Sequence, residues 1–309
     1  MSIYVEQWEN RVERNINEST QAPWLDAVPE LDTSIIEMSS GSASEKNKIH
    51  IPTTDFEPDV LINNTTYPIA LQDYTDSDVE IQLDKFQTKA TTLSDDQIDG
   101  SSYQQIDVVT ASHTEKIRTT KHIKAAHAMA PAANTAATPV VLTLGLGTEA
   151  SGERLRCTYE SLVNLKDRCD KATPKVDGDR ILVLCDDHFN DLLLDRKNFG
   201  DQLVNYQEGK PAPRICGFLI YRFKDNPYYN ATALTKLAYG AVPSAGQYQG
   251  SFVFVANKIA KKTGKTKMYF SPAQADTETQ TNKMNFRHYF ICVPKRNQHI
   301  AALVSKNKA

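Results

Sequence analysis

The segment whose residue types most suggest chemistry is a glycine-containing loop between a predicted strand and a predicted helix. Val140–Leu144 predicts a buried strand, Gly145–Gly152 is the loop, and a helix is expected from about Glu153. This order is the context of a dinucleotide-binding site, in which backbone N–H groups hold a pyrophosphate. The glycines follow GxGxxxxG rather than GxGxxG, however, and the next strand brings Asp186 much later than the roughly 20 residues expected for a ribose-binding acid. We therefore favour a simple turn, with Ser151 capping the helix.

A second candidate lies where the next predicted strand ends. Arg180–Cys185 is apolar enough for a strand buried on both faces, and Asp186, Asp187 and His188 follow it before a short helix at about Phe189–Lys197. Thiol, carboxylate and imidazole groups in one place could form a nucleophilic or metal-binding cluster. Consecutive side chains diverge at such a junction, however, and Asp is a preferred residue at a helix start. We therefore favour a strand end followed by a helix cap.

The remaining histidines and cysteines show no metal-binding spacing. His113, His122 and His127 fall on one predicted helix, but a separation of five residues does not stack the last two on one helical face. An odd number of cysteines without a CxxC pair indicates reduced, mostly buried thiols. These cysteines are Cys157, Cys169, Cys185, Cys216 and Cys292. The sequence predicts no catalytic residue, no cofactor and no metal site.

Charge narrows the class of protein further. The 309-residue chain has 35 basic and 38 acidic side chains, and its net charge of −3 argues against a general nucleic-acid binder. Residues 1–100 carry 20 of the acids and 6 of the bases, so the remainder is net basic. This asymmetry fits either an acidic front that lies on the basic back of another copy, or a solvated acidic extension. No stretch approaches about 18 apolar residues and the start lacks the features of a signal peptide, so we expect no membrane partner.

The N-terminal part of the chain, residues 1–93, is expected to be extended, and we call it the front. Residues 1–50 contain a short amphipathic start and then a Pro- and Ser-rich stretch, in which we expect nothing to close a core. Within residues 51–93, Tyr67–Leu71 and Val79–Leu83 alternate as strands on either side of an acidic turn, and predict a long hairpin with Pro68 at a sheet edge. A two-stranded ribbon is marginally stable in water, so this hairpin is expected to lie on something else.

A long helix and a mixed core follow. Ser94–Gln97 predicts a capping box, and a narrow apolar stripe from about Ser102 to Met129 predicts a long polar helix that ends before Pro131. Beyond a helix that ends near Lys171, further strands are expected at Arg214–Phe223, Ser251–Ala256 and Met284–Val293, and His299–Ser305 closes the chain. Five lysines at 258, 261, 262, 265 and 267 form a basic, loop-like stretch. That stretch could contact nucleic acid, contact the acidic front of a neighbour, or simply be solvated.

The order of elements from 153 to 229 resembles that of a known family. An amphipathic helix leads through a proline loop to R-I-L-V-L, a short helix with Leu192-Leu193-Leu194, then I-C-G-F-L-I-Y and N-P-Y-Y. This order resembles the P- and A-domain core of tailed-phage major capsid proteins of the HK97 fold. The resemblance implies an α+β fold with an N-terminal arm at 1–50, an extended hairpin (the E-loop) at 51–93, and a spine helix at 94–130. It implies a mixed α/β core of P-domain and A-domain at 131–309, with the A-domain at roughly 186–250.

The same resemblance implies a structural role without catalysis. A protein of this kind assembles with itself into hexamers and pentamers, which form an icosahedral or prolate shell around double-stranded DNA without sequence specificity. Its further partners would be portal, scaffolding or decoration proteins. It would be assembled in the host cytoplasm and would reside in the virion as part of the capsid.

Two alternatives to this function stay open at the level of sequence. One is an encapsulin-like nanocompartment shell, and the other is a nucleotide-binding enzyme that uses the loop at Gly145–Gly152. If the chain forms a shell, the apolar side chains of its front are the expected assembly contacts. These are Trp8, Trp24, Tyr67, Ile69, Leu71, Tyr74, Val79, Ile81, Leu83 and Phe86.

Overall fold

The computed structural model divides the chain into two compact units, one of residues 31–84 and one of residues 1–30 together with 85–309. We describe each unit by itself. The structure describes residues 12, 15–16, 21–31, 48–54, 59–69, 71–72, 76–94, 105–145, 150–151, 154–195, 204–205, 210–211, 214–275 and 278–308.

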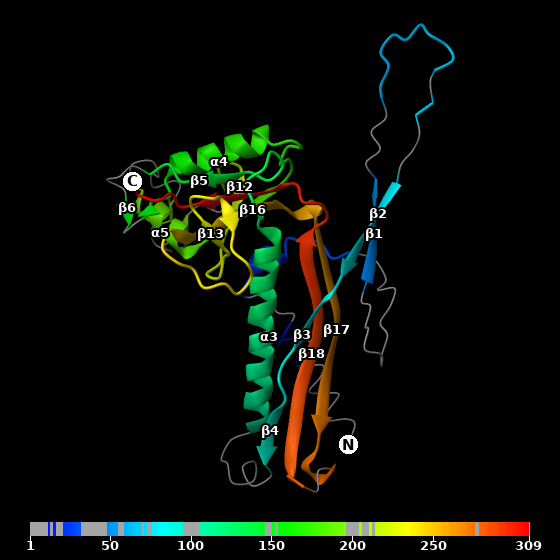
Figure 1. Cartoon of the computed structure of the whole chain (residues 1–309), viewed down its shortest axis with the longest axis vertical. Helices are drawn as coiled ribbons and strands as arrows, with labels where there is room; N and C mark the ends of the chain where they lie inside the picture. The colour runs from blue at the N-terminus through cyan, green and yellow to red at the C-terminus, as the bar shows by residue number, and fades with distance from the viewer. Residues whose placement is uncertain are drawn as a thin grey trace. The chain divides into compact units, whose positions relative to one another are not determined.

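The larger unit is built on a six-stranded mixed sheet (Figure 1). β16 is antiparallel to both of its neighbours, whereas β8 and β12 run parallel, as do β19 and β5. This arrangement differs from the parallel sheet of a dinucleotide-binding fold. The strand order is β11 (Arg214–Ile215), β12 (Phe218–Arg222), β8 (Arg180–Leu184), β16 (Ser251–Val255), β19 (Ile300–Val304) and β5 (Val140–Leu142).

Helices α4 (Tyr159–Lys171) and α5 (Asp186–Leu194) cover one face of this sheet. Successive side chains of a strand point to opposite faces, so Leu182 and Val253 pack with Leu162 of α4 on this side. Their neighbours along the same strands face the other way. The apolar runs in the sequence are therefore continuous because the central strands are buried on both faces.

Part of the front of the chain fills the opposite face. Trp24 is fully buried and packs edge-on against Phe223 and Phe252, with ring centroids 5.6 and 5.7 Å apart. Val12 and Ile16 are also buried, in a second cluster. The expectation that nothing within residues 1–50 contributes to a core is wrong, because the open face of the sheet needs these apolar side chains to exclude water.

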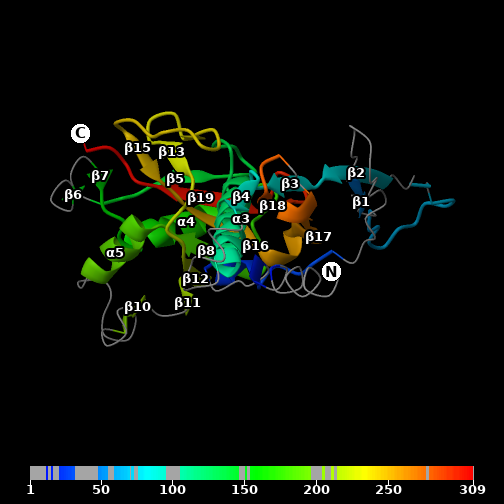
Figure 2. The ribbon, with the colours of Figure 1, turned by 90° about the horizontal axis from the view of Figure 1, so that it is seen from below.

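The predicted long helix is confirmed as α3 (Gln105–Met129), and it packs along a long two-stranded hairpin. That hairpin consists of β17 (Ile259–Ser271) and β18 (Thr281–Pro294), and β3 (Asp84–Gln87) and β4 (Thr91–Ser94) pair with β18. Figure 2 shows α3 end-on, with the hairpin on one side and α4 and α5 on the other.

The basic stretch at 258–267 is a strand and not a loop. Most of it lies in β17, where Lys261 pairs with Cys292 and Lys267 pairs with Arg287, and the register shifts between Thr263 and Thr266. Gly264 lies within this shift, which indicates a bulge rather than a turn. Pairing with the apolar strand β18 overrides the weak strand propensity of lysine.

The smaller unit contains a β-hairpin with a different first strand from the one predicted. β1 (Lys48–Thr54) pairs with β2 (Asp76–Gln82), so that Ile49 lies opposite Ile81 and Ile51 lies opposite Val79. The described residues of 67–71 form no strand. The prediction for Tyr67–Leu71 is wrong because the partner strand is Lys48–Thr54, whose isoleucines match the alternation of β2.

The helix predicted from about Glu153 begins six residues later, at Tyr159. The backbone N–H of Thr158 donates to Ser161 Oγ at 3.3 Å, which makes Thr158 the cap rather than Ser151. Ser151 belongs instead to a short strand that pairs with Arg154. The loop after Leu144 therefore leads into a small antiparallel pair and not directly into a helix.

The predicted strand Arg214–Phe223 is two strands, because Cys216 and Gly217 turn the chain with φ angles of 52° and 82°.

Residues 95–97 of the predicted capping box and Gly147 lie outside the described residues. The remaining short elements are η1 (Pro23–Leu25), β6 (Ala150–Ser151), β7 (Arg154–Leu155), β9 (Val204–Asn205), β10 (Lys210–Pro211), β13 (Tyr228–Asn230), β14 (Thr235–Lys236), β15 (Gln247–Gln249), η3 (Ala256–Lys258) and η4 (Ala273–Ala275).

Candidate functional site: a buried polar network and an exposed apolar loop

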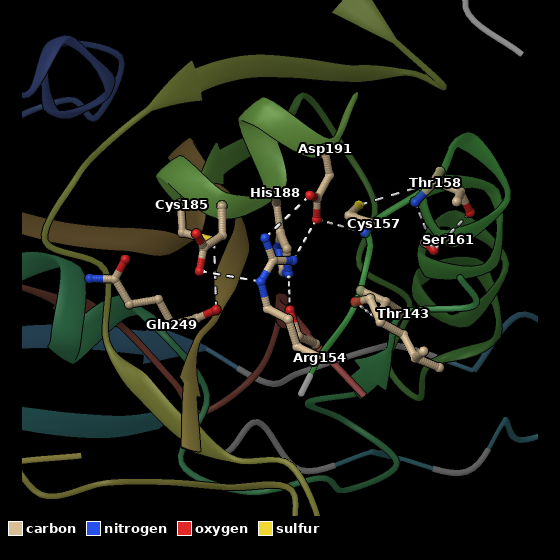
Figure 3. Close-up of polar contacts among 12 residues, drawn as sticks. Thr143, Arg154, Cys157, Thr158, Ser161, Cys185, His188, Asp191 and Gln249 are labelled. Atoms are coloured by element: carbon tan, nitrogen blue, oxygen red, sulfur yellow. Dashed lines mark hydrogen bonds and ion pairs between the residues drawn. The ribbon is translucent and has the colours of Figure 1, made fainter. Parts of the chain in front are cut away.

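The cluster that follows β8 belongs to a largely buried polar network in the larger unit (Figure 3). His188 is fully buried, with Nδ1 2.8 Å from Ser251 Oγ and Nε2 2.9 Å from Ser305 Oγ. Burial lowers the pKa of His188 to about 4 and raises the pKa of Cys185 to about 12. At neutral pH the imidazole is uncharged and the thiol is protonated. This cluster joins α5, β16 and Ser305, the residue that follows β19, and its Cys185 is a thiol rather than a nucleophilic thiolate.

A buried ion pair extends the same network. Arg154 Nη1 lies 2.6 Å and Nη2 lies 3.2 Å from the two carboxylate oxygens of Asp191, which also accepts the backbone N–H of Cys157 at 2.9 Å. Arg154 Nε is 3.6 Å from Asp187 at the start of α5. These contacts fasten α5 to the segment that leads into α4. The predicted strand end and helix start are confirmed, but the N-cap is Cys185, whose side chain makes no capping hydrogen bond, and Asp187 lies in the first turn.

The helix histidines face three different environments. His113 Nε2 lies 2.8 Å from Thr91 Oγ1, and His127 Nε2 lies 2.9 Å from the carbonyl of Leu237. His122 is buried, and its pKa is lowered to about 4, mainly by burial. Within the described part of the chain, no three or more His, Cys, Asp and Glu side chains come together as metal ligands. All five cysteines are free, four of them buried and Cys216 half-buried.

The smaller unit carries a loop with exposed apolar side chains between β1 and β2. Val60, Ile62 and Leu71 are 82%, 84% and 99% exposed, and Tyr67 and Ile69 are also more than half exposed. Exposed apolar groups at this density are unusual in a monomer and are typical of a surface that binds another protein. We call residues 59–72 the apolar loop.

The other predicted contact residues have different surroundings. Trp24 lies in the core of the larger unit, Ile81 and Leu83 are buried, and Phe86 is half-buried against the core. Val79 pairs with Ile51 in the hairpin. Trp8 and Tyr74 lie outside the described residues.

None of the helices that the structure describes is both long and apolar enough to cross a bilayer.

Known capsid structures share this arrangement of elements. The chain is similar to the capsid structure of the cyanophage P-SCSP1u, with a TM-score of 0.63, 14% identity and coverage of 90% of each chain. It is similar to the capsid of Ralstonia phage GP4, with a TM-score of 0.61, 5% identity and coverage of 86% of this chain and 85% of that one. It is also similar to the virus-like particle from Pyrococcus furiosus, with a TM-score of 0.53, 10% identity and coverage of 97% and 99%.

No protein-family model matches the chain, and no curated protein sequence matches it. The likeness is therefore one of fold. The chain has the HK97-like α+β fold of tailed-phage capsid proteins, as its sequence predicts.

Proposed function

We propose that the protein is a capsid subunit that assembles with itself into a closed shell. The observation that carries this proposal is the similarity to phage capsid structures over about nine tenths of both chains. The apolar loop supports it, because the loop exposes side chains that a monomer would normally bury. The function is mechanical, and no catalytic step is part of it.

The driving force for assembly would be burial of the apolar loop on another subunit. Each Å² of apolar surface removed from water contributes roughly 25 cal/mol, against which stand the costs of association and of ordering side chains. Most of the apolar surface of Val60, Ile62 and Leu71 is exposed to water and could be buried on assembly. Among the predicted contacts, Tyr67 and Ile69 share this property, whereas Trp24 does not.

The finer features of the shell follow from the resemblance. We infer hexamers and pentamers in an icosahedral or prolate shell, with portal, scaffolding or decoration proteins as further partners. The net charge of −3 suits a shell that encloses double-stranded DNA without binding it tightly. The protein would be assembled in the host cytoplasm and reside in the virion.

An encapsulin-like compartment is a second candidate, favoured by the near-complete coverage of the Pyrococcus virus-like particle. The nucleotide-binding alternative has less support. A Cβ atom on Gly145 would lie 2.4 Å from the carbonyl oxygen of Arg156, so this glycine accommodates the neighbouring backbone rather than a phosphate.

Negative-stain images of the purified protein test the proposal. We expect closed particles tens of nanometres across, and particles from infected cells should contain double-stranded DNA. Particles that contain only protein cargo would favour the compartment. Monomers that are stabilised by nucleotides in a thermal-shift assay would contradict both kinds of shell.

A further inference from the structure

The six-stranded sheet has a free edge at β5. β19 is its only partner strand among the described residues. Thr143 N–H donates to the carbonyl of Val304, and Ala302 N–H donates to the carbonyl of Pro139. Since backbone groups alternate in direction along a strand, the N–H and C=O of Leu142 point away from β19.

Side chains already accept hydrogen bonds from the backbone N–H groups on either side of Leu142. Val140 N–H donates to Asn134 Oδ1 at 3.0 Å, and Leu144 N–H donates to Ser161 Oγ at 2.9 Å. The described residues provide no such partner for Leu142. The open part of the edge is therefore short, and a single residue of an extended chain could pair with it through two hydrogen bonds.

A groove of about 690 Å³ lies along this edge, and its charged side chains are all basic. They are Arg168 and Lys171 of α4 and Lys306 after β19. Lys171 is paired with Asp167 at 2.8 Å. Arg168 and Lys306 are exposed and have no acidic partner in the described part of the chain. The groove therefore combines an open strand edge with two available cations, which suits an extended acidic peptide.

The chain itself contains a segment of this kind. In residues 54–60, TDFEPDV, the acids Asp55, Glu57 and Asp59 occupy alternate positions. In an extended chain, alternate residues share one face and direct their backbone groups to the same edge. Pro58 alternates with these acids, so its backbone faces the opposite edge of the extended segment. The absence of an N–H on proline therefore removes no hydrogen bond to β5.

We propose that the groove beside β5 binds the acidic segment 54–60 of a second copy of this chain. Glu57 pairs with Leu142 through the backbone, and the acidic side chains lie near Arg168 and Lys306. This inference rests on the proposed shell function and adds to it one specific contact between subunits.

Two charge-reversed chains test the contact. The first carries Arg168→Glu and Lys306→Glu in the groove, and the second carries Asp55→Lys, Glu57→Lys and Asp59→Lys in the segment. Each alone should lower particle yield by about tenfold or more, because every contact then places like charges together. An equimolar mixture should restore particles that contain both chains, because each groove can then meet a segment of opposite charge.

The control chain carries Lys175→Glu and Lys258→Glu, which change the net charge equally outside the groove and should leave the yield unchanged. An unchanged yield for the groove variant would overturn the proposal. Restoration in a chain that carries all five substitutions, but not in the mixture, would place the contact within one subunit and also overturn it.

Cross-linking keeps this test separate from that of shell formation. Carbodiimide treatment of mixed isotope-labelled and unlabelled parent chains should join Lys306 of one copy to Asp55, Glu57 or Asp59 of another. Particles without such a cross-link would contradict the groove contact alone. Failure of the parent chain to form particles would contradict the shell function, and absence of the cross-link in that soluble protein would count against the contact as well.

Discussion

At the scale of single residues, the ion pair of Arg154 and Asp191 is a buried, two-pronged polar contact of the larger unit. Asp191→Ala would leave a buried guanidinium without its carboxylate and the N–H of Cys157 without its acceptor. We expect the free energy of unfolding to fall by about 3–5 kcal/mol. Urea denaturation of unassembled subunits measures this change. Asp167→Ala, which removes an exposed pair with Lys171, should cost no more than about 1 kcal/mol. If both substitutions lowered the free energy of unfolding by the same amount, the buried pair would contribute no more to stability than the exposed one.

Three buried histidines predict how stability depends on pH. Burial lowers the pKa of His122 and His188 to about 4 and that of His288 to about 3, from 6.5. The folded state therefore favours the neutral form, and this stability is present above pH 6.5 and is lost as pH falls towards 4. Each histidine contributes a slope on the order of 1 kcal/mol per pH unit in that window. His188→Gln should reduce the slope in denaturation experiments between pH 7 and 5, and an unchanged slope would contradict this assignment.

At the scale of elements, the apolar loop should matter for assembly and not for folding. Ile62→Ser and Leu71→Ser together should leave the denaturation midpoint of the subunit nearly unchanged, because both side chains are exposed. Particle yield should fall strongly, because the apolar surface that assembly would bury is lost. Val242→Ser is the matched control, since Val242 is 88% exposed and lies outside the loop. If the double variant and the control assembled alike, the loop would not be an assembly contact.

Single elements could be predicted from the sequence, whereas the pairing between distant elements could not. Local periodicity predicts α3, β8 and β16 because each pattern depends on neighbours within one element. It does not predict that Val79 pairs with Ile51 rather than with a residue of 67–71, since strand pairing depends on distant segments. Periodicity also does not predict the buried position of Trp24 or the Arg154–Asp191 pair, because their partners lie far along the chain.

At the scale of the whole molecule, the uneven charge predicts that assembly depends on salt. Residues 1–100 carry 20 acids and 6 bases, and the rest of the chain is net basic. If these parts meet between subunits, particle yield should fall as ionic strength rises from about 0.01 M to about 1 M, over which the screening length shrinks from about 30 to 3 Å. Light scattering measures the yield, and apolar burial should leave part of it at high salt. A yield that does not change with salt would exclude a role for the asymmetry.

Cryo-electron microscopy of particles formed by the parent chain tests the shell-forming role most directly. The account predicts a closed shell of this chain, in which the apolar loop of each subunit contacts another subunit. A chain that remains monomeric or forms only small open oligomers would contradict the central claim, as would a shell in which residues 59–72 face solvent.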